Sequence, residues 1–342
     1  EGIMKVLAIG ATGFIGPPVV RYLDEQGHEV AVFHRGKTEA ELPGSTRHIH
    51  GDRNSLSELR DAFERFGPEV VVDLVPYTEA QIRQTVQALT GLADRLVVVS
   101  SSDVYRNYDG WRGESTHPPD PVPLREDAPL REKHYPYRGY EELDFEYADD
   151  YEKILVEKAA KSRSALPSTI LRLPAVYGPE NEQHRLRAHL QRMVDERPFI
   201  LLGETQAQWR WTHGYVENVA AAIALAATDE QAAGRTYNVG ERETPTEAKR
   251  VQKLAEIVGW TGEVVELPNE ELPDHLQAPF NWQYELATDT SRFRDELGYS
   301  EPVSWEEALE QTVAWEQMNV LGTTEDGQFD YAAEAEAVEN AL

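Results

Sequence analysis

The chain has 342 residues, carries 61 Asp and Glu against 33 Lys and Arg for a formal net charge of −28, and contains no cysteine. This length suffices for one large domain or two closely joined domains, while the missing cysteines exclude disulfides, thiolate metal sites and cysteine nucleophiles. The negative charge disfavours nucleic acids and anionic membranes as partners. Because no apolar run approaches the ~20 residues that cross a bilayer, we expect a cytoplasmic protein without a membrane partner.

The excess of acidic residues has two interpretations. A dense carboxylate surface stays hydrated in concentrated salt, where self-repulsion is screened, and this predicts a halophilic protein. An ordinary acidic cytosolic protein explains the same composition. The sequence leaves both interpretations open.

A glycine-rich motif follows the first apolar stretch. Residues 4–9 predict a strand, Gly10-Ala-Thr-Gly-Phe-Ile-Gly16 comes next, and a helix is expected to begin near Pro17. In such an arrangement the glycines let bare backbone approach a diphosphate, and the free N–H groups of the helix bind its oxygens. We therefore expect dinucleotide contacts from Gly10, Thr12, Gly13, Phe14, Ile15 and Gly16.

The second predicted strand, His28–Phe33, ends where a dinucleotide site distinguishes NAD from NADP. An acidic residue at this position binds the ribose 2′-hydroxyl of NAD, whereas basic groups favour the 2′-phosphate of NADP. His34 stands here, with Arg35 and Lys37 beside it. We therefore expect NADP, with NAD still open and a solvated basic turn as the alternative.

Helices and strands alternate regularly beyond this point. Ser55-Leu-Ser-Glu58 resembles a capping box that opens a helix to Phe66, residues 69–75 form a continuous apolar strand, and a second helix starts at Thr78. This alternation predicts an α/β fold with a doubly wound parallel sheet.

Two histidines, His48 and His50, alternate on one face of the stretch before Asp52. A zinc site needs three or four ligands, and the sequence shows no third one nearby. We therefore expect ordinary strand residues here and no metal.

Residues 106–148 interrupt the alternation with prolines, tyrosines and charges, and predict a long surface excursion near the site. A helix is expected from about Asp149 to Ser164, followed by the strand 168–173. The resulting division assigns residues 1–173 and part of 205–240 to a dinucleotide-binding domain, 174–204 and 241–320 to a smaller substrate domain, and 321–342 to an acidic tail.

Several segments, in this order, resemble the extended short-chain dehydrogenase/reductase family of nucleotide-sugar epimerases and dehydratases. They are the Gly10–Gly16 motif, Val97-Val-Val-Ser-Ser-Ser-Asp-Val-Tyr105, Lys153-Ile-Leu-Val-Glu157, Leu171-Arg-Leu-Pro-Ala-Val-Tyr-Gly-Pro179, Tyr237-Asn-Val-Gly240 and Ser291-Arg-Phe-Arg-Asp-Glu-Leu-Gly-Tyr299. The resemblance implies a Rossmann-type dinucleotide domain and a smaller C-terminal substrate domain. It also implies a catalytic site built from Ser or Thr, Tyr and Lys.

The resemblance assigns the catalytic serine to Ser101, four residues before Tyr105, and the catalytic lysine to Lys153. The family tyrosine precedes this lysine by four residues, but Asp149 occupies that position. On a helix, Asp149 either acts as the altered acid/base or forms a simple ion pair with Lys153. Other tyrosines could supply the phenol, although Tyr151 is expected to point away from Lys153 on a helix. The remaining candidates are Tyr135, Tyr137, Tyr140 and Tyr147.

The family pattern assigns the rest of the cofactor site by position. Asp52 is expected at the adenine edge with Arg53 nearby, and Leu74 and Val75 beneath the nicotinamide ribose. Pro174 and Val176 complete the predicted cofactor contacts.

Ala175 replaces the asparagine that family members use to contact nucleotide sugars. The substrate is therefore predicted to be a sugar-like molecule or a nucleotide sugar. Substrate contacts are expected from Ser102, Tyr105, Arg138 and Arg210.

We expect an NAD(P)-dependent oxidoreductase or epimerase/dehydratase, with a homodimer formed through the lysine helix as the family implies. The main alternative is a protein that binds the dinucleotide as a sensor or structural ligand without turnover. An atypical RNA-binding family member is a more distant alternative, which the net charge disfavours.

Overall fold

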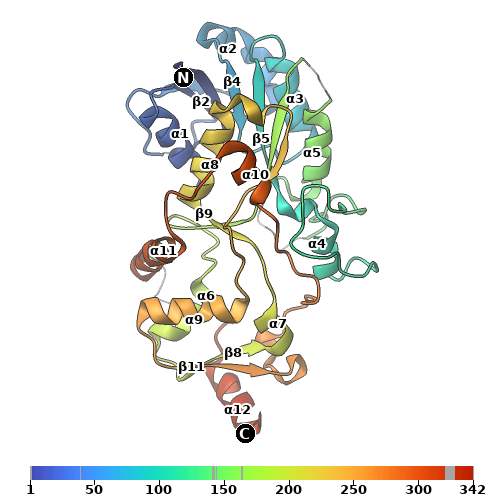
Figure 1. The fold of residues 1–342 in the computed structure, drawn as a ribbon, viewed down its shortest axis with the longest axis vertical. Coiled ribbons are helices and arrows are strands. Elements are labelled where there is room, and N and C mark those ends of the chain that lie inside the picture. The colour runs from blue at the N-terminus through green and yellow to red at the C-terminus, as the bar shows by residue number, and fades with distance from the viewer. Residues whose placement is uncertain are drawn as a thin grey trace.

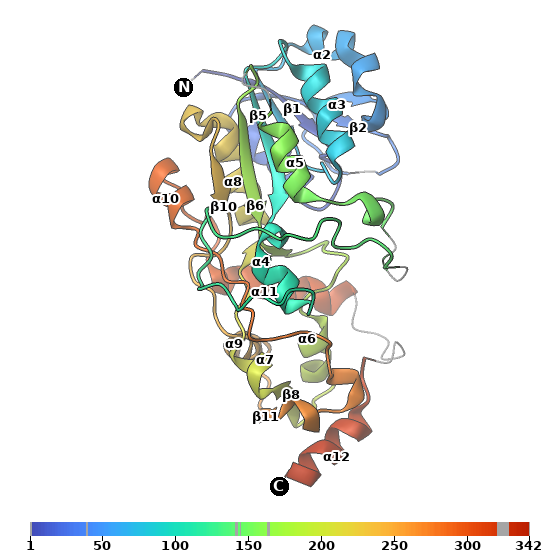
Figure 2. The same cartoon turned by 90° about the vertical axis from the view of Figure 1, so that its right-hand side faces the viewer.

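The computed structural model describes residues 2–38, 40–140, 143, 145–162, 165–319 and 328–341. The molecule is elongated, with a large α/β body that contains the N-terminus and a smaller body that ends at the C-terminus (Figure 1). The carboxyl ends of the central strands point toward the smaller body (Figure 2). Within the described residues, no helix combines the length and apolarity that a membrane crossing needs.

The large body contains a seven-stranded, fully parallel sheet with the order β10-β6-β5-β4-β1-β2-β3. The order reverses between β1 and β4, so the crevice for a ligand opens there. The predicted doubly wound sheet is thus confirmed. The strands are β1 Lys5–Ile9, β2 Glu29–His34, β3 Arg47–His50, β4 Val70–Asp73, β5 Arg95–Ser101, β6 Ser168–Leu173 and β10 Thr236–Asn238.

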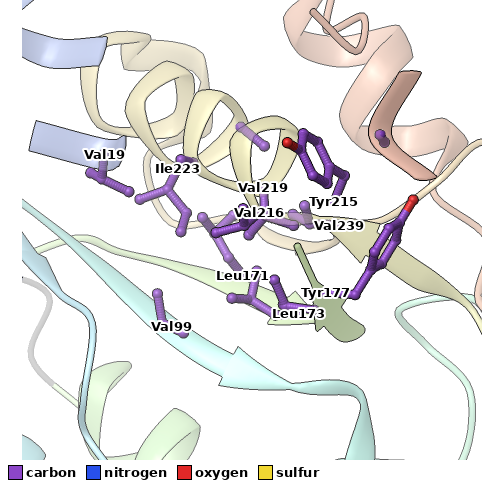
Figure 3. Close-up of a cluster of buried hydrophobic side chains, with 14 of the residues drawn as sticks. Val19, Val99, Leu171, Leu173, Tyr177, Tyr215, Val216, Val219, Ile223 and Val239 are labelled. Atoms are coloured by element: carbon purple, nitrogen blue, oxygen red, sulfur yellow. The ribbon is translucent and has the colours of Figure 1, made fainter. Parts of the chain in front are cut away.

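Helices cover both faces of this sheet because its strands alternate apolar side chains between two separate cores. Val6 and Ala8 of β1 belong to the core that α1 (Gly16–Glu25) and α8 (Val216–Thr228) cover. Figure 3 shows Val19 of α1 and Ile223 of α8 in this core. Leu7 and Ile9 point to the opposite core. That core is covered by α2 (Arg60–Phe66), α3 (Glu79–Leu89) and α5 (Lys153–Ala160).

The smaller body is built around a two-stranded parallel sheet of β8 and β11. A second pair, β7 with β9, lies where the two bodies join. Helix α10 packs against β10 of the large sheet, with the Phe293 and Tyr237 rings 5.2 Å apart, although its residues fall in the range expected for the substrate domain. The bounds are α4 Arg106–Trp111, β7 Ala175–Tyr177, α6 Arg187–Val194, β8 Phe199–Gly203, α7 Glu204–Gln208, β9 His213–Tyr215, α9 Glu247–Val258, β11 Glu263–Leu267, α10 Ser291–Leu297, α11 Trp305–Asn319 and α12 Tyr331–Ala341.

The acidic tail contains α12, which docks on the smaller body. Glu334 of α12 is fully buried and pairs with Arg192 and His275, so one acidic residue of the tail has a structural partner. Residues 321–327 of the predicted tail lie outside the described residues.

Two helix starts differ from the prediction. The first lies at Asp52, whose side chain accepts a hydrogen bond from the Asn54 N–H and opens a 3₁₀ segment; the predicted cap, Ser55, sits at a kink. The second is α5, which begins at Lys153 because the Glu152 carboxylate caps it through the Ile154 N–H at 2.9 Å. The capping box at Thr78 is confirmed, with Gln81 as its partner.

Candidate active site

The three glycines of the N-terminal motif have three different physical roles. Gly10 has a φ of +77°, and a Cβ there would lie 2.2 Å from Val75. A Cβ on Gly16 would lie 2.3 Å from the backbone of Ala11, so helix and strand can pack closely only with glycine. A Cβ on Gly13 meets no atom within 4 Å, which leaves the middle of the loop open to a ligand.

Any N–H groups available to an anion lie in the loop before α1. No side chain caps the N-terminus of α1, but Pro17 and Pro18 in its first turn have no N–H, and the Gly16 N–H donates to the Gly13 carbonyl at 3.0 Å. Thr12, Phe14 and Ile15 are half-buried along the same loop. An open loop with uncapped N–H groups fits the diphosphate of a dinucleotide.

The wall after β4 is held by a buried ion pair. Arg53 contacts both carboxylate oxygens of Asp73, at 3.2 and 3.0 Å, and also donates to the Val75 carbonyl at 2.5 Å. Arg53 is therefore not a free cofactor ligand, and its expected role is corrected to positioning Val75. Leu74 and Val75 follow β4, and Val75 lies against the position of Gly10. Their expected place beneath the nicotinamide ribose stays a prediction.

Asp52 is exposed, and one of its carboxylate oxygens is occupied by the hydrogen bond to the Asn54 N–H. The carboxylate keeps acceptor capacity on both oxygens, and its expected contact to adenine stays a prediction. Pro174 and Val176 are buried at the join between the bodies, and the Val176 carbonyl accepts hydrogen bonds from Asn181 and Arg185.

The side chains at the end of β2 contact other residues and do not form an isolated, solvated basic turn. The His34 ring contacts those of His48 and His50, and burial with its two histidine neighbours lowers the pKa of His34. His34 is therefore neutral at pH 7. Arg35 pairs with Glu146 at 3.3 Å, whereas Lys37 is exposed and forms no ion pair with any described residue.

The same cluster overturns the reason for excluding a metal at these positions. The expectation counted only His48 and His50, which share one face of β3. The parallel pairing of β2 with β3 places His34 opposite His50 and supplies a third imidazole. Sequence spacing did not reveal it because the two strands are paired only in the folded sheet.

Lys153 is buried at the carboxyl ends of β4 and β5. Its ammonium donates hydrogen bonds to the carbonyls of Pro76 and Val99, at 2.9 and 3.0 Å. Burial lowers the pKa of Lys153 to about 8, against the opposing effect of nearby Asp103 and Asp73. Because Pro76 follows Val75 directly, the lysine is linked to the wall beside Gly10.

Asp149 does not share a helix face with Lys153, so the expected ion pair and the expected acid/base position are both wrong. Asp149 lies in a 3₁₀ turn, Ala148–Asp150, ahead of α5. Its exposed carboxylate accepts a hydrogen bond from the Gly139 N–H at 2.8 Å.

Tyr151 is the residue that brings a phenol close to Lys153. It lies outside the helix with extended backbone angles (φ −62°, ψ 121°), so its side chain points toward Lys153, whose ammonium is 5.7 Å from the ring centroid. The Tyr151 hydroxyl donates to Asp103 at 2.7 Å. Burial and the Asp103 charge raise its pKa well above the ordinary value, while a hydrogen bond with Ser101 acts in the opposite direction.

The sequence placed Tyr151 on the wrong side because it treated residues 149–164 as one continuous helix. The cap at Glu152 decides otherwise. Its carboxylate is fully buried, pairs with Arg131 at 3.0 Å and accepts the Tyr135 N–H at 2.7 Å. These contacts hold Tyr151 out of the helix. Two of them come from the excursion, whose fold no local pattern could reveal.

Asp103 is the second functional residue that sequence reasoning missed. It is buried, and its Oδ2 also receives the Tyr137 hydroxyl at 3.3 Å, which contacts Tyr108 at 2.8 Å. Its Oδ1 is buried and has no hydrogen-bond partner within the described residues. Native structures leave few buried polar atoms without a partner, so this oxygen marks Asp103 as a candidate functional residue. The signal was its position two residues after Ser101, within the matching segment.

Tyr105 is not a substrate contact, because its side chain is completely buried. Its hydroxyl donates to Asn238 at 2.6 Å and accepts from Arg172 at 3.1 Å, and burial raises its pKa to about 12. The residue therefore joins β5, β6 and β10 structurally. Ser102 is half-buried just beyond β5, and its contact with a substrate stays a prediction.

The two arginines expected at the substrate already have partners. Arg138 stacks on Tyr135 and donates to the Asp149 carbonyl at 3.0 Å. Arg210 forms a two-point contact with the Glu285 carboxylate, at 2.5 and 2.9 Å, so its charge is neutralised within the protein. Neither is free to bind a substrate anion.

Arg185 is a better-placed cation. It donates to the Val176 carbonyl at 2.9 Å, lies 5.4 Å from the Trp211 ring, and forms no ion pair with any carboxylate in the described part of the chain. Burial lowers its pKa, against the opposing effect of Tyr108 and Tyr137. An arginine without a counter-ion beside the tyrosines of the site suits an anionic ligand.

The sequence profile described as the NAD dependent epimerase/dehydratase family matches residues 6–240 of this chain. The chain belongs to this family. The matched range includes the glycine loop, Ser101, Tyr151 and Lys153, and it confirms the resemblance on which the family prediction rested. A nicotinamide dinucleotide is accordingly supported as the cofactor, consistent with the open loop at the start of α1.

Individual relatives are distant but cover most of the chain. The 2'-dehydrokanamycin reductase of Streptomyces kanamyceticus is 26% identical over 310 residues, covering 86% of this chain and 76% of the reductase. The UDP-N-acetyl-alpha-D-glucosaminuronate decarboxylase of Bacillus cytotoxicus is 23% identical over 336 residues, covering 91% and 97%. The Bordetella bronchiseptica enzyme WbmG, solved with NAD and UDP, has a TM-score of 0.68 at 18% identity, covering 96% and 97%. This structural likeness shows a shared fold.

Proposed function

We propose that this protein is an NAD(P)-dependent oxidoreductase or epimerase/dehydratase that acts on a hydroxyl-bearing carbon of a sugar-like substrate, with nucleotide sugars as the preferred class. One observation carries the proposal: Ser101, Tyr151 and Lys153 converge at the carboxyl ends of β4 and β5. Lys153 also donates to the carbonyl of Pro76, which follows Val75 beside the glycine loop. Hydroxyl, phenol and ammonium are the groups that the family chemistry requires.

A bound nicotinamide dinucleotide supplies or accepts a hydride; proton movement and orientation fall to the residues of this chain. Tyr151 is protonated at neutral pH because its pKa is raised, so it can donate a proton to an oxygen that gains charge. The Ser101 hydroxyl stabilises the same oxygen, and the Lys153 ammonium offsets the negative charge left on the phenol. Asp103 positions the phenol by accepting the Tyr151 hydroxyl at 2.7 Å.

Substrate class follows from the unpaired cation and from the relatives. Arg185 lies beside Tyr108 and Tyr137 without a counter-ion among the described residues, which suits the phosphates of a nucleotide sugar. Two proteins similar to this chain are named for, or solved with, uridine nucleotides. The 2'-dehydrokanamycin reductase broadens the test to carbonyl groups on other sugar-like molecules.

The cofactor preference is proposed to be NADP. Lys37 is exposed and unpaired among the described residues, and Arg35 lies two positions earlier. Lys37 supplies the charge for a 2′-phosphate, because His34 is neutral at pH 7 and Arg35 is paired with Glu146. NAD remains the comparison in the binding experiment. The predicted homodimer stays a prediction.

The experiment titrates the protein with NADPH and NADH by calorimetry and then measures hydride transfer with UDP-sugars and keto-sugars. Binding followed by turnover of one substrate class supports the proposal. Tight binding of either dinucleotide without turnover of any substrate would support the sensor alternative instead. No binding of either dinucleotide contradicts both.

A further inference from the structure

Three imidazole rings form a compact cluster at the edge of the large sheet. His34 ends β2, while His48 and His50 lie two residues apart on β3, the edge strand. The ring centroid of His34 is 5.1 Å from that of His48 and 4.5 Å from that of His50. No other three His, Asp or Glu side chains in the described part of the chain bring potential metal ligands this close together.

We propose that His34, His48 and His50 together bind one divalent transition-metal ion. One nitrogen from each ring lies within 4.8 Å of the others, and Nε2 of His34 is 2.9 Å from Nδ1 of His48. Nitrogens around a tetrahedral zinc ion, with bonds of about 2.0–2.1 Å, are separated by about 3.4 Å. Small rotations of the exposed rings therefore suffice to reach this geometry.

The surroundings permit a cation. His48 and His50 are exposed and His34 is half-buried, so an ion has direct access and the rings are not needed to fill the core. Two neighbouring arginines are paired with carboxylates: Arg35 with Glu146 at 3.3 Å and Arg47 with Glu29 at 3.9 Å. The net charge of −28 favours cations in general.

Ligation replaces two weak contacts within the cluster. The His34–His48 hydrogen bond is exchanged for two metal bonds. If His34 ligates through Nε2, its Nδ1 must carry the proton, so the 3.2 Å contact from the Gly36 N–H is lost. Three imidazoles select zinc, copper, nickel or cobalt over magnesium and calcium, because the latter prefer oxygen ligands. Three protein ligands leave a fourth position open for water or a ligand anion.

The site is tested on full-length, untagged protein that has been stripped of metal and contains no dinucleotide. Zn²⁺ is titrated by calorimetry, and Co²⁺ is followed by its visible absorption. The expected result is one saturable site per chain, with the absorption bands of tetrahedral cobalt. A His48→Gln, His50→Gln double variant should bind at least about tenfold more weakly, since it retains one ligand.

His117→Gln is the matched control. His117 is also partly exposed, but it pairs with Glu132 and does not belong to the histidine cluster. Its metal affinity should equal that of the wild type. Circular dichroism without metal verifies that all three proteins are folded. Absence of a saturable site in the wild type, or unchanged affinity in the double variant, overturns the proposal. Neither result depends on turnover, so the proposed enzyme function is judged separately.

Discussion

The glycine loop and the proposed catalytic corner are neighbours in space but are constructed differently. The loop consists of consecutive residues from Gly10 to Gly16, and its function belongs to backbone atoms. The corner, which we define as Ser101, Asp103, Tyr151 and Lys153, joins the end of β5 to the start of α5. Its function belongs to side chains whose directions depend on where a helix begins.

This difference explains why the family pattern agrees with the backbone geometry of the loop but not with the position of the phenol. Glycine spacing determines the loop because each glycine removes a local clash. The interval of four residues between tyrosine and lysine has meaning only on a continuous helix. Here the helix starts at Lys153, so an interval of two residues brings a phenol to the same place.

The largest expected effect tests the identity of the acid/base residue. Tyr151→Phe removes the hydroxyl that contacts Asp103 and should reduce kcat by about 100-fold or more. Asp149→Asn is the matched control, since Asp149 is exposed and contacts the Gly139 backbone; kcat should stay within about threefold. Steady-state rates under hydride-transfer conditions measure both. The reverse ranking would restore Asp149 as the acid/base and remove the distinction drawn between the two regions.

The next effect sharpens the backbone role of the loop. Gly16→Ala places a Cβ 2.3 Å from Ala11 and should cost about 3 kcal/mol of unfolding free energy, together with most of the dinucleotide affinity. Gly13→Ala meets no protein atom and should leave stability within about 0.5 kcal/mol, with dinucleotide affinity reduced where the methyl faces the ligand. Urea unfolding and calorimetry measure the two quantities. Equal stability of both variants contradicts the assigned packing.

The pH dependence of stability tests the burial of Lys153. Its folded pKa is about 8, below the unfolded value near 10.4, so the unfolded state binds more protons between these values. Stability should therefore rise with pH in this window, by about 2 kcal/mol between pH 7 and pH 10.

Lys153→Met removes this titration, so the difference between wild type and variant isolates it from other groups. Urea unfolding at several pH values should show the wild type gaining stability relative to the variant as the pH rises. A constant difference across the series would mean that the ammonium is solvated and does not belong to a buried corner.

The smallest effect concerns the substrate anion. Arg185→Gln should raise KM for a nucleotide sugar about tenfold with little change in kcat. The reason is that the ion pair between Arg185 and the phosphates is lost equally from the substrate complex and from the transition state. Arg210→Gln is the control, since Glu285 already neutralises Arg210, and its KM should change by less than about twofold. A larger effect at Arg210 would support Arg210, the residue predicted from the sequence, as the substrate contact.

Most of the fold could be predicted because its signals are local. Buried strands such as 69–75, the glycine loop and the capping box at Thr78 all depend on neighbours within a few residues. The start of α5 could not be predicted, since it depends on a buried contact between Glu152 and Arg131 across the excursion. Tyr105 shows the same limit, because its burial against Asn238 involves a strand far along the chain.

The sequence by itself determined the family, the parallel sheet and the shape of the glycine loop, because periodicity and glycine spacing act through backbone geometry that each segment carries with it. Only the tertiary structure decided which phenol reaches Lys153, which arginine lacks a counter-ion and that His34 joins the histidines of β3. These properties depend on side chains from distant segments, and long-range packing alone sets their directions and partners.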